Sequence, residues 1–117
     1  MTPVGSYSGL SNSTDLGQMF TDDGALSPSD DAGDPVLAVD SSGNFYYATL
    51  VANFTTQESY VGISKSTGGG SSFLVPVDAS GTSGTGKTNF QDKEWLAVDT
   101  TGGPSDGNLY LAWTQFY

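Results

Sequence analysis

The sequence has no cysteine, no histidine and no arginine, and three lysines are its only cationic side chains. Without cysteine the chain forms neither disulfides nor thiolate metal sites, and its redox compartment stays open. Serine–histidine and cysteine–histidine catalysis and histidine-ligated zinc are excluded as well, unless a partner chain supplies the missing groups.

Positive charge is scarce, and the 13 carboxylates give a net charge of −10. Such a chain repels nucleic acid and anionic membranes, so neither is expected as a partner. The same charge attracts metal cations, although a simple gain in solubility explains it equally well. No signal peptide and no apolar run of membrane-spanning length is recognised, and the localisation is left open.

Helical periodicity is also missing, whereas glycine, serine and threonine are abundant. A length of 117 residues suits one modest domain. The sequence therefore predicts a single all-β domain over residues 1–117.

An octet of the form S-x-D-x-G-x-x-F occurs at Ser13–Phe20 and returns at Ser66–Phe73, with Gly68 in place of Asp15. The similarity extends upstream, so we assign internal repeats at about 6–54 and 59–117. The Asp predicts a turn whose backbone amides bind its carboxylate, and the Gly supplies a positive φ. In the second copy glycine alone must permit the turn, and in both copies the aromatic is expected to fasten the hairpin to the core.

A second pair of similar segments lies between the octets and after them. Asp34–Asp40 and Asp92–Asp99 share the run Leu-Ala-Val-Asp, which begins at Leu37 in the first segment and at Leu96 in the second. Downstream of each run, Gly107–Ala112 repeats the segment Gly43–Ala48. Each pair is typical of a buried strand, a turn and a second strand.

These octets and hairpins resemble the Asp-box, or bacterial neuraminidase, repeat of sialidase-like β-propellers, and the resemblance covers nearly the whole chain. It implies two blade equivalents in the strand order C-D-A-B-C-D-A-B, where A to D are the strands of one blade. The expected strands cover about 4–12, 19–26, 34–40, 45–54, 59–65, 73–77, 92–99 and 108–117. The family is often secreted or periplasmic. Its sialidases bind the substrate carboxylate through three arginines, and this chain has none, so sialidase activity is excluded.

This strand order leaves half a blade at each end, with exposed strand edges. Two blades cannot close a propeller, which needs at least about four. We therefore expect head-to-tail homo-oligomers in which Asn108–Tyr117 pairs with the N-terminal strand of the next copy. A trimer would give the six blades typical of the family; a dimer or tetramer would give four or eight.

Two further signals are read as structural. Gly81–Thr88 matches the phosphate-binding pattern G-x-x-x-x-G-K-T, but a strand and not a helix is expected after it, so a flexible loop is predicted. Trp95 and Trp113 could stack on sugars, yet their places in repeat strands favour packing in the core.

The two long loops, 27–34 and 78–92, are expected on one face of a propeller. That face would gather Asp30, Asp31, Asp34, Glu58, Asp78, Lys87, Asp92, Lys93 and Glu94. Asp34 and Asp92 would lie nearest the axis as oxygen ligands of Ca²⁺, with Mg²⁺ less favoured. Alternatively, both merely begin strands and accept backbone hydrogen bonds.

Two functions remain open. One is a metal-dependent hydrolase of small esters, lactones or phosphotriesters, by analogy of fold with the six-bladed calcium propellers of the paraoxonase-like and gluconolactonase-like enzymes. Asp92 or Glu94 would serve as base or nucleophile, and Lys93 would stabilise the developing negative charge. The other is a non-catalytic fragment that binds glycan or only assembles.

Overall fold

A computed structural model describes residues 7–26, 31–53, 58–81 and 89–117, and over these ranges the chain forms strands and turns with no helix. The all-β prediction is thereby confirmed. The strands are β1 (Gly9–Asn12), β2 (Thr21–Ala25), β3 (Asp31–Val39), β4 (Phe45–Asn53), β5 (Glu58–Ser66), β6 (Val77–Asp78), β7 (Phe90–Val98) and β8 (Leu109–Phe116). Within the described ranges no helix is long and apolar enough to span a membrane.

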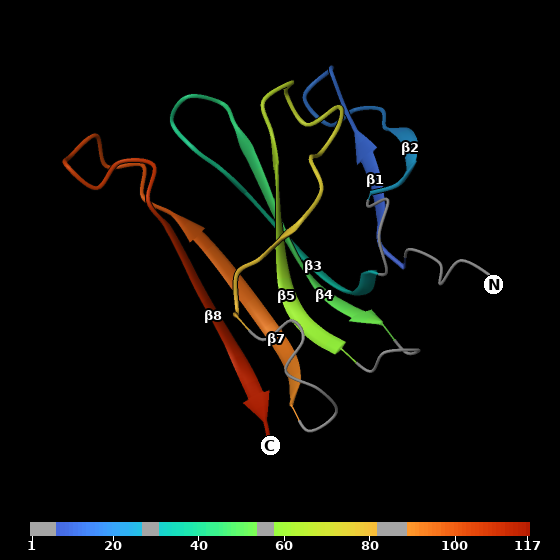
Figure 1. Ribbon diagram of the computed structural model, residues 1–117. Helices are drawn as coiled ribbons and strands as arrows, with labels where there is room; N and C mark the ends of the chain where they lie inside the picture. The colour runs from blue at the N-terminus through green and yellow to red at the C-terminus, as the bar shows by residue number, and fades with distance from the viewer. Residues whose placement is uncertain (1–6, 27–30, 54–57, 82–88) are drawn as a thin grey trace.

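The strands form three antiparallel sheets. A four-stranded sheet of order β3-β4-β5-β6, called the middle sheet below, lies between the β1–β2 hairpin and the β7–β8 hairpin (Figure 1). The predicted strands fall on these elements, with one clear shift. The strand expected over 73–77 is regular only at its end, because Val77 and Asp78 alone form β6, although the Leu74 N–H also donates to Lys65 O of β5 at 2.9 Å.

The sequence repeat is also a repeat of strand register. In β3–β4, Val36 lies opposite Ala48, and in β7–β8 the corresponding Trp95 lies opposite Ala112. The correspondence found in the sequence therefore places equivalent residues opposite one another in both hairpins.

The pairs β1–β2 and β5–β6 repeat each other in the same way. Gly9 lies opposite Ala25, and Gly62 lies opposite Asp78. The shift along the sequence that separates these two pairs is the one that separates the two octets. The two hairpins built on the octets thus keep one register, although β6 has only two paired residues.

Side-chain hydroxyls and carboxylates hold the octet turns. In the first copy Asp15 Oδ1 accepts the N–H groups of Gln18 and Met19, both at 3.0 Å. Glycine alone does not hold the second copy as predicted, because Ser66 Oγ accepts the Gly70 N–H at 3.2 Å. The aromatics differ: Phe73 packs edge-on against Tyr47, with ring centroids 5.9 Å apart, whereas Phe20 is 67% exposed.

The core forms where the middle sheet packs on the β7–β8 hairpin. Because directly opposite residues share a face of a sheet, the two faces in contact follow from the registers. The near face of the middle sheet carries Val36, Ala38, Tyr46, Ala48 and Ile63. The inner face of the hairpin, which packs against it, carries Leu96, Val98 and Leu111.

Asp31 is a buried carboxylate at the start of β3 and not, as predicted, a loop residue. It accepts hydrogen bonds from the backbone N–H groups of Ser8 and Gly33 and from the hydroxyls of Tyr47 and Thr49. Burial opposes ionisation, but these donors together hold the pKa of Asp31 below its ordinary value of 3.8. The residue ties β1, β3 and β4 together.

We expect Asp31→Asn to lower the free energy of unfolding at pH 7 by about 2–3 kcal/mol, because an amide cannot accept all four hydrogen bonds. A depressed carboxyl pKa stabilises the fold above the unfolded value and loses that effect as pH falls through the folded value. The difference from wild type should therefore shrink below about pH 4. Urea denaturation at several pH values measures it, and Asp22→Asn is the exposed control. Equal stability of Asp31→Asn and wild type at pH 7 would contradict this role.

Candidate functional site

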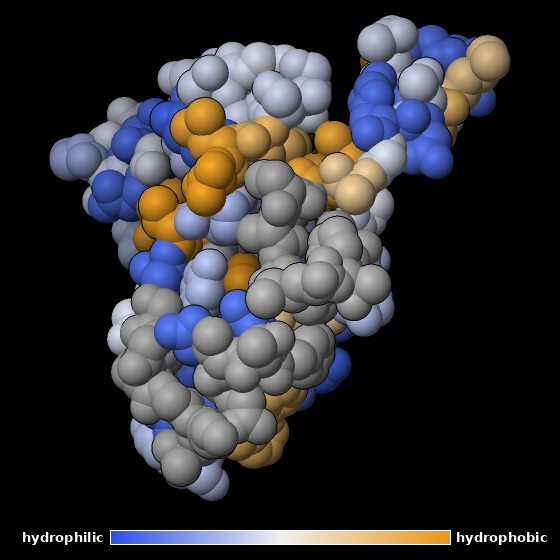
Figure 2. Space-filling view, turned by 45° about the vertical axis from the view of Figure 1, so that its right-hand side comes forward, coloured by the Kyte–Doolittle hydropathy of each residue, from blue (hydrophilic) through white to orange (hydrophobic). Residues whose placement is uncertain are grey.

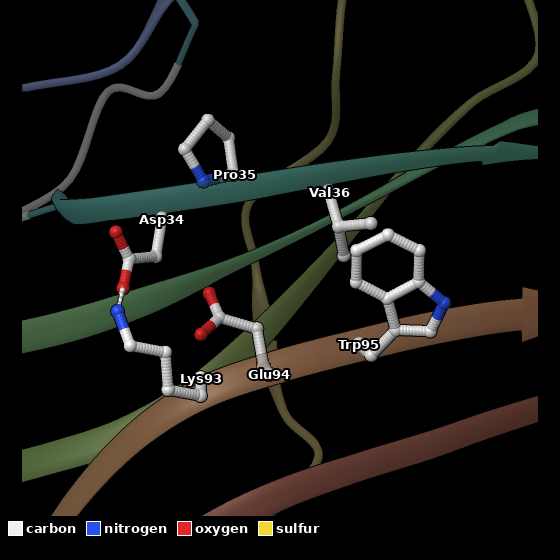
Figure 3. A pocket seen from close by; sticks show the side chains of 6 residues that line it. All are labelled: Asp34, Pro35, Val36, Lys93, Glu94 and Trp95. Atoms are coloured by element: carbon white, nitrogen blue, oxygen red, sulfur yellow. Dashed lines mark hydrogen bonds and ion pairs between the residues drawn. The ribbon is translucent and has the colours of Figure 1, made fainter.

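A pocket of about 260 Å³ lies between the first halves of β3 and β7. It is lined by Asp34, Pro35, Val36, Lys93, Glu94 and Trp95 (Figure 3). Three predicted site residues, Asp34, Lys93 and Glu94, therefore meet here. Asp34 comes from the first repeat and the other two from the second, so the pocket needs the packing of two sheets.

Matching irregularities in the two strands shape this pocket. The register shifts between Gly33 and Val36 in β3, and between Asp92 and Trp95 in β7. At equivalent positions inside these shifts, Asp34 has φ 54° and Lys93 has φ 56°, which side-chain-bearing residues rarely adopt. Such bulges redirect side chains and are frequent beside active sites.

The Lys93 ammonium faces Asp34 across the mouth of the pocket. Its Nζ lies 3.4 Å from Asp34 Oδ2, and the two side chains are 73% and 49% exposed (Figure 3). An ion pair this exposed is screened by water and adds little stability. Its ammonium is therefore free to move toward an anionic group at the mouth.

Glu94 is the buried acid of the pocket, with only 4% of its surface exposed. Neither carboxylate oxygen has a hydrogen-bond partner among the described residues. Burial raises the pKa of Glu94 to about 7, and the charges of Asp34 and Asp92 add to the rise. The nearby backbone amides of Glu94 and Leu50 moderate it without forming a hydrogen bond. Glu94 thus exchanges its proton near neutral pH.

Asp92 and Gln91 complete the polar surroundings on β7. Asp92 Oδ1 accepts the Lys93 N–H at 2.9 Å, which helps to fix the bulge. Gln91 is fully buried, and its amide oxygen and nitrogen both lack partners within the described part of the chain. The bulge brings Gln91 and Glu94 to the buried side of one strand, although three positions separate them.

The pocket does not fit a Ca²⁺ ion held by one chain. Calcium takes six to eight oxygen ligands, but the Lys93 ammonium already lies beside Asp34, one of the two predicted ligands. Over the ranges described, no three metal-ligating side chains form a group. The sequence also allows Asp34 and Asp92 of several copies to bind one Ca²⁺ around a common axis, and this stays a prediction.

The remaining predicted residues have varied outcomes. Trp95 is 70% exposed at the rim of the pocket, so its predicted packing in the core is wrong for the single chain. Asp30, Lys87 and most of the Gly81–Thr88 loop lie outside the described residues. Gln91 was missed, because an isolated glutamine in a strand carries no sequence signal of burial.

We expect Glu94→Gln to raise the free energy of unfolding at pH 8, by at most about 3 kcal/mol. An acid whose folded pKa is raised binds its proton more tightly in the folded state. Stability should therefore fall as pH rises from 4.5 to about 7 and then stay level. Glutamine removes this loss.

Urea denaturation of both proteins at pH 4.5 and pH 8 measures the effect. The matched control is Glu58→Gln, which changes the only other glutamate of the chain. Unchanged stability of Glu94→Gln at pH 8 would show that burial does not raise the pKa of Glu94 as described above.

Comparisons with protein-family models, with curated proteins and with solved structures found no match. Function is therefore inferred from the chemistry of the pocket and the pairing of the strands.

Proposed function

We propose that this chain is a sialidase-like β-propeller fragment with a hydrolytic site for small esters, lactones or phosphotriesters in the Asp34–Glu94 pocket. The observation that carries the catalytic proposal is Glu94: a buried, unpartnered carboxylate with a pKa of about 7, in an open pocket beside a lysine. Effective general bases titrate near the working pH.

The propeller part of the proposal is supported by the order and packing of the sheets. Strands β3 to β6 follow one another as in a complete blade, and β1–β2 and β7–β8 have the registers of its second and first halves. The middle sheet and the β7–β8 hairpin pack face to face. In this arrangement the pocket lies where two neighbouring innermost strands begin.

The proposed reaction uses Glu94 as the base. Ionised Glu94 takes a proton from water, and the oxygen of that water attacks the carbonyl carbon or phosphorus of the substrate. The Lys93 ammonium stabilises the negative oxygen that forms. The alkoxide leaves with the proton that Glu94 had taken, so ester and water become acid and alcohol. Between the two predicted bases, burial favours Glu94 over Asp92.

Asp34 serves to position Lys93. The 3.4 Å ion pair places the ammonium beside Asp34 at the mouth of the pocket and not on the Glu94 carboxylate, which has no hydrogen-bond partner among the described residues. A direct Lys93–Glu94 pair would lower the pKa of Glu94 and weaken it as a base.

A second candidate is binding without catalysis, as in a glycan-binding module. Trp95 favours it, because an exposed indole at the rim of a charged pocket can stack on a sugar ring. This candidate predicts saturable sugar binding and no turnover.

We expect the protein to hydrolyse p-nitrophenyl acetate, an aromatic phosphotriester or a γ-lactone, with a rate that rises with pH through about 7. Glu94→Gln should lower kcat by about 100-fold or more. Lys93→Met should cost less, because it removes charge stabilisation alone. Asp99→Asn, just beyond the far end of β7, should have the wild-type rate.

Initial rates from pH 5 to 9, with and without EDTA, provide the measurement. Absence of turnover, or turnover that survives Glu94→Gln, would overturn the catalytic proposal. Loss of turnover in EDTA would instead favour the predicted Ca²⁺-dependent mechanism.

A further inference from the structure

The registers reveal one strand pairing that occurs only once. A four-stranded sheet has three pairings: first with second strand, second with third, and third with fourth. The first of these occurs twice in the chain, as β3–β4 and β7–β8. The last also occurs twice, as β5–β6 and β1–β2. The pairing between second and third strands exists only as β4–β5. In the part of the chain described, β8 pairs with β7 alone and β1 with β2 alone.

The two open edges cannot meet within one chain, because the middle sheet separates them. The β7–β8 hairpin packs on the near face of that sheet. β1 lies on the other side of the middle sheet from this hairpin (Figure 1). Its Leu10 lines a small pocket with Leu37 and Phe45 of the far face. The missing partner of each edge must therefore come from elsewhere.

The exposed faces of the two sheets are related by the sequence repeat, as the unpaired edges are. The outer face of the β7–β8 hairpin carries Trp95, Ala97, Tyr110 and Ala112, which correspond to Val36, Ala38, Tyr46 and Ala48 of the near face. The near face is covered by the hairpin of its own chain, but Trp95 and Tyr110 are 70% and 55% exposed.

The far face of the middle sheet is the complementary surface. Leu37 and Val39 correspond to Leu96 and Val98 of the inner face, yet they are 51% and 46% exposed. Figure 2, which brings the β1–β2 side forward, shows hydrophobic side chains exposed between hydrophilic ends. One chain therefore displays both halves of the contact that forms its own core.

Phe20 gives an independent indication of the same partner. It corresponds to Phe73, which packs on Tyr47, and Tyr47 corresponds to Leu111. In the single chain Phe20 remains 67% exposed. A copy of β8 alongside β1 would bring a Leu111 to Phe20.

We propose that β8 of one copy pairs with β1 of a second copy of this chain, with Ala112 opposite Leu10 and Leu111 opposite Ser11. This register repeats Ala48 opposite Ile63 and Tyr47 opposite Ser64 in β4–β5. The composite sheet β7-β8-β1-β2 then lies between the middle sheets of the two copies. It covers Trp95 and Tyr110 with the far face of the second copy, around Leu37 and Val39.

This contact uses different surfaces on the two copies, so it propagates until a ring closes. Each copy adds one complete and one composite sheet, so two, three or four copies give four, six or eight sheets, all within the range seen in propellers. Three copies are expected, because six blades are typical of the family that the sequence resembles. The assembly depends on the propeller part of the proposed function and is independent of catalysis by Glu94.

The experiment is a cysteine cross-link, made clean by the absence of native cysteine. Leu10→Cys with Ala112→Cys places the two sulfurs on directly opposite residues, within disulfide reach. Ser11→Cys with Ala112→Cys is the matched control, because a shift of one residue puts the thiols on opposite faces of the sheet.

After mild oxidation, we expect the first pair to give covalent dimers and trimers on non-reducing gels, with nothing larger, and the control pair to give at least about tenfold less, since its thiols point apart. Light scattering of the unmodified chain should give three times its 12.1 kDa mass. Efficient cross-linking of the control pair would overturn the register. Products beyond the trimer would overturn a closed ring of six sheets. A stable folded monomer would overturn the pairing of copies, while leaving the hydrolysis assay to decide the proposed function separately.

Discussion

The packing of the near face of the middle sheet against the inner face of the β7–β8 hairpin is the contact on which the rest of the structure depends. Tyr46, Ala48 and Leu96 are buried there. The other buried apolar side chains of the described ranges all lie in the middle sheet itself: Tyr47, Leu50, Val51 and Val61. Hydrophobic stabilisation is therefore concentrated in this sheet and on its near face. The same contact brings β3 beside β7 and thereby forms the pocket, so stability and the proposed function depend on one interface.

Glu94 illustrates the opposition between those two demands. A carboxylate without donors is costly to bury, because its charged form loses hydration and gains no hydrogen bond in return. A leucine at this position would pack on the near face without that cost. Burial of the Glu94 carboxylate therefore lowers the stability of the fold. A role in acid–base chemistry near neutral pH would explain why a buried acid is present at this position. Asp31 shows the contrasting case, since four hydrogen-bond donors outweigh the effect of burial and favour the charged form.

The two repeats differ most clearly at the pocket, where the proposed chemistry takes place. Pro35 corresponds to Glu94, and Asp34 to Lys93, so two equivalent bulges carry different side chains. The first bulge supplies a carboxylate and a proline; the second supplies an ammonium and a buried acid. Divergence at equivalent positions lets two copies of one strand geometry form a single asymmetric pocket, which identical repeats could not do.

The sequence by itself determined the strands, the octet turns and the correspondence between repeats, because these depend on local alternation, on Asp, Ser and Gly turn chemistry and on self-similarity. It also grouped Asp34, Lys93 and Glu94 at the beginnings of two inner strands. Only the tertiary structure decided which of them are buried. Bulges at Asp34 and Lys93 change the alternation of faces, and a bulge depends on the neighbouring strand. The burial of Glu94 and Asp31 and the exposure of Trp95 follow from which sheets lie against one another, and no local pattern encodes that.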